Sequence, residues 1–182
     1  MSYKALDLQQ VFRVLGGGQT INISTISKNG VYDVMTAAWN TLYNMDEPLV
    51  VLDRNHTTSQ NILDTHKYII ALPGKDLIGK LKQVGSAHGH DVGDKFKWAG
   101  ITPEFTEKFK LPYIPGSLAY FECELSMEKI FDDTGILVGK CVNAMVREEL
   151  FDFKRNVFDP GLKQLLHTLD EDSFLVGNEY CN

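Results

Sequence analysis

A cluster of polar side chains after residue 55 is the first part of the chain whose residue types suit ligand chemistry. Residues 56–62 read His-Thr-Thr-Ser-Gln-Asn-Ile and follow a short apolar run. A threonine or serine ahead of Ile62 predicts a helix start, where backbone N–H groups lack partners and the helix dipole is positive. Those donors, the hydroxyls, and the nearby Arg54 and His56 would suit a terminal phosphate. The alternative is an ordinary capped helix that binds no ligand.

A second candidate segment spans residues 85–96, Gly-Ser-Ala-His-Gly-His-Asp-Val-Gly-Asp-Lys-Phe. Its histidines, His88 and His90, could ligate a metal together with Asp91, but no further ligands follow at a recognisable spacing. We therefore predict no metal site. The other interpretation is a glycine-rich loop that folds over a ligand. Lys95 would then place a positive charge near that ligand, or would lie on the surface of a short helix that includes Trp98.

Side chains become small at residues 36–38, Thr-Ala-Ala, directly before Trp39. Small side chains let a ligand come close to the backbone, so that N–H and C=O groups can hydrogen-bond its edge. The alternative is that the small residues pack against neighbouring strands and that Trp39 belongs to the core.

The elements that must position these residues are predicted to be mainly strands. Hydrophobic alternation and apolar runs favour strands and one amphipathic helix, joined by turns such as Asn29-Gly30, whose residues suit positive φ. The predicted strands are 21–25, 31–35, 49–52, 67–72, 117–127 and 136–146, and the helix is 76–84. Residues 100–115 are irregular and rich in proline, which suits a surface excursion able to cover a cleft.

The C-terminal part predicts a long hairpin followed by a helix. Alternation over 117–127 places Cys123 on one side of its strand and Glu122, with Glu124, on the other. Leucines at 162, 165, 166 and 169 predict a helix, and residues 174–177 form a last apolar run.

Composition is typical of a globular protein of 182 residues, 20.5 kDa, with 43% hydrophobic and 23% charged residues. We expect one domain over 1–182, with an N-terminal segment at about 1–20 and a C-terminal helix and strand at about 150–182. The net charge of −6 disfavours nucleic acid. No apolar run is long enough to span a membrane, no signal peptide is evident, and the three cysteines form no CxxC pair. These features predict a cytoplasmic protein.

Several catalytic classes have no motif in this chain. There is no GxSxG nucleophile elbow, no cysteine with a placed histidine, and no GxGxxG dinucleotide fingerprint after a strand. The residues alone therefore identify no catalytic acid, base or nucleophile.

The order of the motifs resembles a known family. Gly30, Met35-Thr36 and Trp39, a strand preceded by Asp46-Glu47-Pro48, and then the 56–62 segment follow one another as in the flavin reductase-like family of FMN-binding split barrels. The similarity covers roughly residues 25–146. It implies a mainly β fold, a six-stranded antiparallel Greek-key split barrel with short appended helices. It also implies a homodimer with FMN near the subunit interface.

The resemblance assigns cofactor-binding positions, and three departures accompany them. Asp33 replaces a common asparagine, Ala38 a serine before Trp39, and His88 the usual serine of the glycine-rich loop. The implied FMN-binding residues are Met35, Thr36, Ala37, Ala38, Trp39, Asp53, Arg54, Asn55, Thr57, Thr58, Ser59, Asn61, Ser86, His88, Gly89, Lys95 and Phe96.

Three functions are compatible with the resemblance. The first is an NAD(P)H:flavin oxidoreductase, in which NADH or NADPH reduces FMN and electrons pass to an acceptor. The second is a flavoredoxin-like carrier that holds FMN tightly and exchanges electrons with a redox protein. The third is a split-barrel protein without redox function that binds flavin, haem or another ligand.

Overall fold

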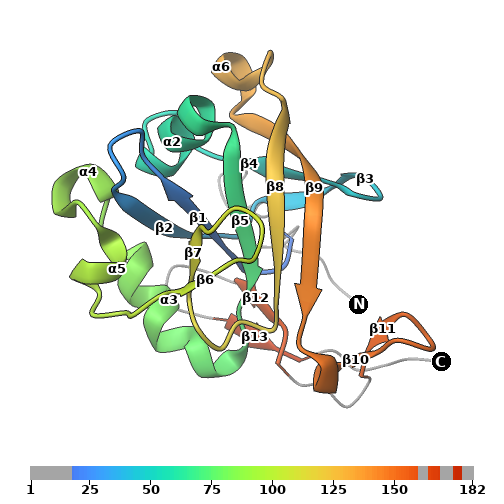
Figure 1. The fold of residues 1–182 in the computed structure, drawn as a ribbon. Coiled ribbons are helices and arrows are strands. Elements are labelled where there is room, and N and C mark those ends of the chain that lie inside the picture. The colour runs from blue at the N-terminus through green and yellow to red at the C-terminus, as the bar shows by residue number, and fades with distance from the viewer. Residues whose placement is uncertain (1–17, 160–163, 169–173, 178–182) are drawn as a thin grey trace, which may run out of the picture.

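The structure, a computed structural model, describes residues 18–159, 164–168 and 174–177. Its centre is one antiparallel sheet of seven strands in the order β2-β1-β5-β8-β9-β4-β3 (Figure 1). The strands are β1 Ile21–Ile26, β2 Tyr32–Ala37, β3 Asn40–Asn44, β4 Glu47–Val51, β5 Lys67–Leu72, β8 Ala119–Met127 and β9 Ile136–Val146. The expected number of six strands is wrong by one, because the residues after Trp39 form the edge strand β3.

The sheet curls on itself because of one short connection. Strands β2 and β3 lie at opposite edges of the sheet, yet only Ala38 and Trp39 separate them along the chain. Consecutive Cα atoms are about 3.8 Å apart, so the two edges must meet within about 11 Å at this corner. The resulting half-barrel encloses a core that includes Ile23, Tyr68 and Leu137.

Helices α2, α3, α4 and α5 lie together on the β1–β2 side of the curled sheet, and α6 lies at the tip of the β8–β9 hairpin (Figure 1). Helix α3 packs against β2, and its Leu81 and Val84 join a second core with Phe96. The helices are α2 Thr57–Thr65, α3 Ile78–Gly85, α4 Gly89–Val92, α5 Lys95–Trp98 and α6 Phe131–Thr134, with 3-10 turns at Lys75–Leu77 and Glu148–Leu150.

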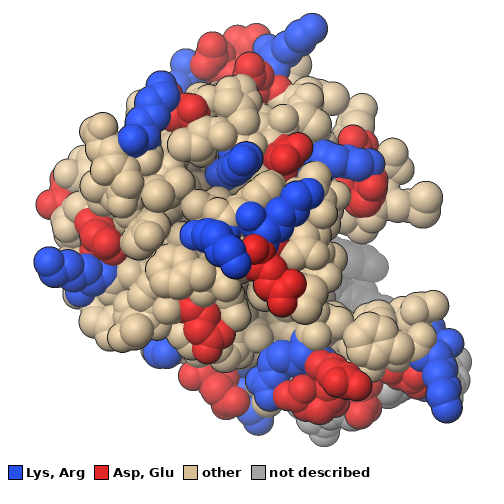
Figure 2. Space-filling view, in the orientation of Figure 1, with Lys and Arg blue, Asp and Glu red and all other residues tan. Residues whose placement is uncertain are grey.

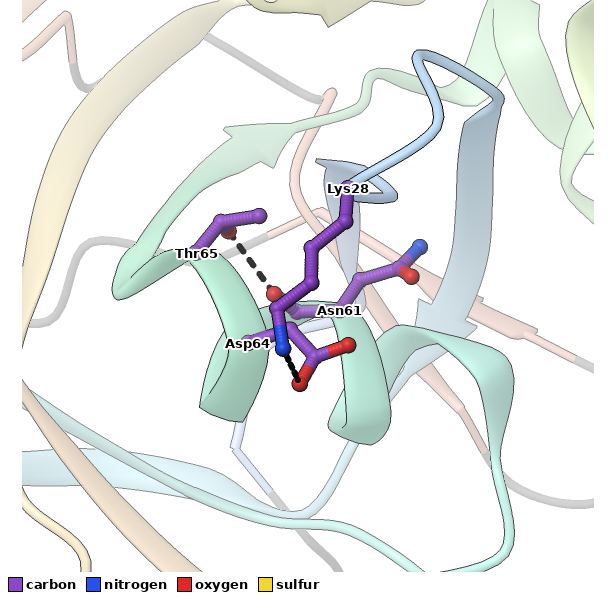
Figure 3. A network of polar contacts seen from close by, with 4 residues as sticks. All are labelled: Lys28, Asn61, Asp64 and Thr65. Carbon is purple, nitrogen blue, oxygen red and sulfur yellow. Dashed lines mark hydrogen bonds and ion pairs between the residues drawn. The ribbon is translucent and has the colours of Figure 1, made fainter.

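The β1–β2 hairpin turns as its sequence predicts, with one difference. Gly30 has φ 80°, and its N–H donates to the Ser27 carbonyl, but Asn29 does not adopt positive φ. Lys28 in this turn forms an ion pair of 2.7 Å with Asp64 of helix α2, and the Thr65 hydroxyl donates to the Asn61 carbonyl within that helix (Figure 3). The Lys28–Asp64 ion pair therefore links the β1–β2 hairpin to helix α2 at the surface.

The C-terminal part differs from the prediction. The expected helix is wrong where it is described, because Leu166 lies in strand β12, Leu166–Thr168, which pairs with β13, Phe174–Val176. Leu162 and Leu169 lie outside the described residues. Two further two-stranded sheets pair Glu104–Phe105 with Pro112–Tyr113 (β6 and β7) and Phe151–Asp152 with Val157–Phe158 (β10 and β11). The predicted apolar run at 174–177 is confirmed as a strand.

Glu122 is the clearest departure from simple alternation. It was expected on the polar side of its strand, but its exposed fraction is 0%. The excursion that contains β6 and β7 covers this side of β8, and the backbone N–H groups of Lys108 and Phe109 donate to the Glu122 carboxylate. A bulge in the β8–β9 pairing also follows Glu122 and shifts the register.

Charged side chains of both signs are interspersed on the face seen in Figure 2, with no large field of one sign. In the part of the chain that the structure describes, no helix is long and apolar enough to cross a membrane.

Candidate functional site

A small cavity lies where strand β2, the start of helix α2 and the loop before helix α4 meet. Its volume is about 130 Å³. It is lined by Asp33, Met35, Thr36, His56, Thr57, Thr58, Val84, Gly85, Ala87, His88, Gly89 and Lys95. Three segments far apart in the sequence thus supply polar, charged and small side chains to one space.

The start of helix α2 faces this cavity with unpartnered polar atoms. The N-cap residue is His56, which makes no side-chain cap, so the expected threonine or serine cap is wrong. His56 Nδ1 and Thr57 Oγ1 are buried and have no hydrogen-bond partner. The helix start also leaves its first backbone N–H groups without intrahelical acceptors. Because buried polar groups are nearly always paired, these atoms suit a polar ligand.

Asp33 and Lys95 are two buried side chains of opposite charge that line the cavity. Their exposed fractions are 2% and 3%. The Thr58 hydroxyl donates to Asp33 Oδ2 at 2.5 Å, while Asp33 Oδ1 has no partner. Burial lowers the pKa of Lys95, and the attraction of Asp33 partly opposes this shift. Lys95 is therefore not the surface lysine that one interpretation predicted.

Three histidines flank the cavity in a row. The ring centroids of His56 and His88 are 5.7 Å apart, and those of His88 and His90 are 5.3 Å apart at an interplanar angle of 15°. Burial lowers the pKa of His56, Asp53 raises it, and the electrostatic interactions with His88 and Lys95 lower it further. His56 is thus held toward its neutral form. The described residues contain no group of three or more His, Cys, Asp and Glu side chains that could hold a metal ion.

Gly89 leaves open the space between β2 and α2. A Cβ atom added at Gly89 would lie 2.5 Å from Asp33 Oδ1 and 3.0 Å from Thr57 Cβ. Any larger residue would therefore displace the groups that line the cavity.

We expect Gly89→Ala to weaken ligand binding in this cavity about 10-fold, because the added methyl group pushes Asp33 and Thr57 aside. Isothermal titration with FMN would measure the change. Gly79→Ala is the matched control, since an added Cβ at Gly79 meets nothing within 4 Å. Equal affinities in the two variants would contradict the expectation.

The structure brings seven of the seventeen sequence-predicted site residues to the cavity. They are Met35, Thr36, Thr57, Thr58, His88, Gly89 and Lys95. Two of their hydroxyls are already engaged. Thr36 donates to the Leu81 carbonyl at 3.0 Å, and Thr58 donates to Asp33.

The other ten lie outside the cavity lining. Ser59 and Asn61 are buried and bond to the Asp53 carbonyl and to Thr25. Arg54 donates to the Asp132 carbonyl instead of reaching the cavity. Trp39 is 56% exposed, so it is not a core residue. The remaining six are Ala37, Ala38, Asp53, Asn55, Ser86 and Phe96.

Two ionisable residues of the cavity, Asp33 and His56, were not among the predicted site residues. In the sequence, Asp33 is a departure from the family pattern, and His56 is a neighbour of the hydroxyls. The position of His56, directly before a helix, was the available signal for it. For Asp33 the signal was a charged residue within a strand that is otherwise expected to be half buried.

Comparison with known proteins identifies the family. A family model described as the flavin reductase like domain matches residues 17–161. The chain belongs to this family. The uncharacterized protein YddH of Escherichia coli is 29% identical over 182 residues, which cover 96% of this chain and 94% of YddH.

Solved structures show the same fold. One is an FMN-binding domain of a flavin reductases-like enzyme from Shewanella baltica, 24% identical, with a TM-score of 0.80 and coverage of 98% and 96% of the two chains. Another is the flavoredoxin of Desulfovibrio vulgaris, 17% identical, with a TM-score of 0.78 and coverage of 100% and 94%. The mainly β split-barrel fold with short helices, implied by the sequence resemblance, is confirmed.

Proposed function

We propose that this flavin reductase-like protein binds FMN with its phosphate in the cavity at the start of helix α2. The observation that carries the proposal is the pair of unpartnered buried atoms, His56 Nδ1 and Thr57 Oγ1, beside the buried cation Lys95. A helix start with free N–H groups, a hydroxyl and a lysine is a donor set suited to phosphate. The family relation and the FMN-binding protein of the same fold support this ligand.

The charges of the cavity fit a phosphate only if Lys95 stays protonated. Asp33 is an anion at the same cavity and would repel phosphate. The Thr58 hydroxyl donates to the Asp33 carboxylate, and the Lys95 ammonium attracts that carboxylate. Part of the negative charge of Asp33 is therefore already compensated. The remaining donors, Thr57 and the α2 N–H groups, are then available for the ligand. Met35 and Thr36, which line the β2 side, would contact the rest of the cofactor.

We further propose that the protein is an NAD(P)H:flavin oxidoreductase. Bound FMN would supply the redox chemistry, accepting electrons from NADH or NADPH and passing them to an acceptor. This chain would hold the phosphate through Lys95 and Thr57, orient the cofactor along β2, and exclude water with the loop at His88 and Gly89. The functional groups at this cavity therefore bind and position a cofactor.

We propose a homodimer for this protein, located in the cytoplasm. The β3 region carries four large exposed apolar side chains, Trp39, Leu42, Tyr43 and Met45, with exposed fractions of 56% to 92%. An apolar group of this kind on a monomer is typical of an interface. Cys123 and Cys141 are free thiols, which suits a reducing compartment.

A flavoredoxin-like electron carrier is the second candidate, supported by the fold shared with a flavoredoxin. It would hold FMN in the same cavity and exchange electrons with a redox protein. The two candidates differ in whether NADH or NADPH is oxidised.

One experiment tests the proposal and separates the candidates. The purified protein would be examined for the visible absorption of bound flavin and titrated with FMN, then mixed anaerobically with NADH or NADPH. Rapid bleaching of the flavin with steady nicotinamide oxidation in the presence of an acceptor is expected. Tight FMN without nicotinamide oxidation would select the carrier. Failure to bind FMN would overturn both and leave a split-barrel protein with another ligand.

A further inference from the structure

Cys123 of β8 and Cys141 of β9 lie directly opposite each other in the sheet. The Cys141 N–H donates to the Asp46 carbonyl at 2.8 Å, so it points away from β8. The N–H and C=O of one residue in an antiparallel strand point to the same neighbour, which makes Cys123 and Cys141 a non-hydrogen-bonded pair. Side chains are closest in such pairs, with Cα atoms about 4.5 Å apart. That spacing lies within the range that a disulfide requires.

The two thiols have different surroundings. Cys123 is fully buried, while Cys141 is half-buried and lines an apolar groove of about 560 Å³ together with Leu42, Met45 and Phe121. The Cys123 Sγ donates to the Phe121 carbonyl at 3.8 Å and the Cys141 Sγ to the Asn143 carbonyl at 3.3 Å. The neighbouring Cys123 side chain is the main cause that lowers the pKa of Cys141 to about 7. The Cys141 side chain, together with burial, raises the pKa of Cys123. Cys141 is therefore the more accessible and the more acidic of the two sulfurs, and its neighbour is a protonated partner. Because Leu42 and Met45 also belong to the proposed dimer face, the oxidant that this groove suits is a small one.

We propose that Cys141 and Cys123 form a peroxide-reactive dithiol, in which Cys141 is oxidised first and Cys123 then closes a cross-strand disulfide. In the first step the Cys141 thiolate attacks one oxygen of a peroxide, and the O–O bond breaks. Sulfur is oxidised to a sulfenic acid, and the peroxide is reduced to hydroxide, which takes up a proton.

The second step uses Cys123 as the resolving thiol. Its sulfur attacks the Cys141 sulfenic sulfur, the S–O bond breaks, and the leaving hydroxide takes the Cys123 proton to form water. The net change is two thiols and one hydrogen peroxide to one disulfide and two waters.

The cysteine pair is separate from the FMN cavity, since neither cysteine lines that cavity. A failure of the flavin proposal would thus leave this one intact.

The test treats the folded protein with hydrogen peroxide, which is small enough to reach a half-buried sulfur. Peptide mapping by mass spectrometry is expected to show a Cys123–Cys141 crosslink, reversed by dithiothreitol, in both the natural chain and Cys181→Ser. A crosslink to Cys181, irreversible oxidation of Cys141 without a crosslink, or no reaction before unfolding would each overturn the proposal.

A pH profile distinguishes a dithiol from two independent thiols. The rate of Cys141 oxidation is expected to rise with pH, with a midpoint of about 7. In Cys123→Ala the midpoint should move above about 8, and the rate at pH 7 should fall about threefold. Dimedone should trap the Cys141 sulfenic acid in that variant, because nothing resolves it. An unchanged midpoint in Cys123→Ala, with its fold confirmed by circular dichroism, would overturn the pairing.

Discussion

Lys95→Gln is expected to weaken FMN binding about 100-fold and to leave riboflavin binding nearly unchanged. Lys95 and Asp33 are both buried at the cavity, and among the described residues no other lysine or arginine lines it. Its removal would leave the phosphate facing the Asp33 carboxylate without a compensating cation. A charge-assisted hydrogen bond contributes about 1.5–3 kcal/mol, and 100-fold corresponds to about 2.7 kcal/mol. Riboflavin lacks the phosphate, so it reports on the rest of the site.

Fluorescence titration with FMN and riboflavin would measure both affinities. Lys97→Gln is the matched control, because Lys97 lies on the same helix but is exposed. Thermal unfolding of Lys95→Gln without ligand would show that the variant is folded. If FMN and riboflavin lose affinity equally, or if Lys97→Gln has the same effect, the phosphate does not bind at Lys95.

Glu122→Leu is expected to lower the free energy of unfolding by about 3–5 kcal/mol. The Glu122 carboxylate accepts hydrogen bonds from Lys108 N at 3.1 Å, Phe109 N at 2.5 Å and Asn143 Nδ2 at 2.6 Å. Leucine would leave these donors without an acceptor, and each unsatisfied buried donor costs about 1–3 kcal/mol. The β6–β7 excursion should therefore detach from β8.

Urea unfolding of Glu122→Leu and of Glu124→Gln would test this effect. Glu124 is the matched control because it lies on the same strand and is exposed. A loss of less than 1 kcal/mol in Glu122→Leu would mean that the excursion is held by other contacts. Amide hydrogen exchange at Lys108 and Phe109 would locate any loosening.

The same carboxylate makes stability depend on pH. Burial raises the pKa of Glu122, but the hydrogen bonds from Asn143, Phe109, Thr106 and Lys108 outweigh this and hold it below its ordinary value. A carboxyl group with a lowered folded-state pKa stabilises the fold above its unfolded pKa of about 4.3. That contribution is lost as the pH falls through the folded-state pKa. Glu122→Leu should lack this part of the acid sensitivity, as unfolding curves at several pH values would show.

Short-range sequence patterns were enough to predict most of the strands and helix α3. The β1–β2 hairpin, the buried strand β5, helix α3 and the long β8–β9 hairpin could be predicted because alternation, apolar runs and turn residues act over a few neighbours. The leucines of the C-terminal part misled the prediction. Leu166 packs in a short strand against the second core, where tertiary contacts override a weak helical pattern.

The candidate site was only partly predictable. A hydroxyl cluster before a helix and a glycine-rich loop indicated the segments, and Thr57, Gly89 and Lys95 do share one cavity. Which side chains face the cavity depends on hydrogen bonds between residues far apart in the chain, and these are not evident from the sequence. Thr58 bonds to Asp33 and Ser59 to the Asp53 carbonyl, so the three adjacent hydroxyls have three different surroundings.

The sequence by itself determined most strands of the main sheet and the turn at Gly30, since these follow from short-range spacing, and the order of its motifs indicated the family. Only the tertiary structure decided that Asp33 and Lys95 line one cavity, that Glu122 is buried under the excursion, and that Cys123 faces Cys141. Each of these arrangements joins residues on different elements, whose meeting depends on how the sheet curls and how its strands are registered. Burial and charge are properties of that assembled environment, and no single segment carries them.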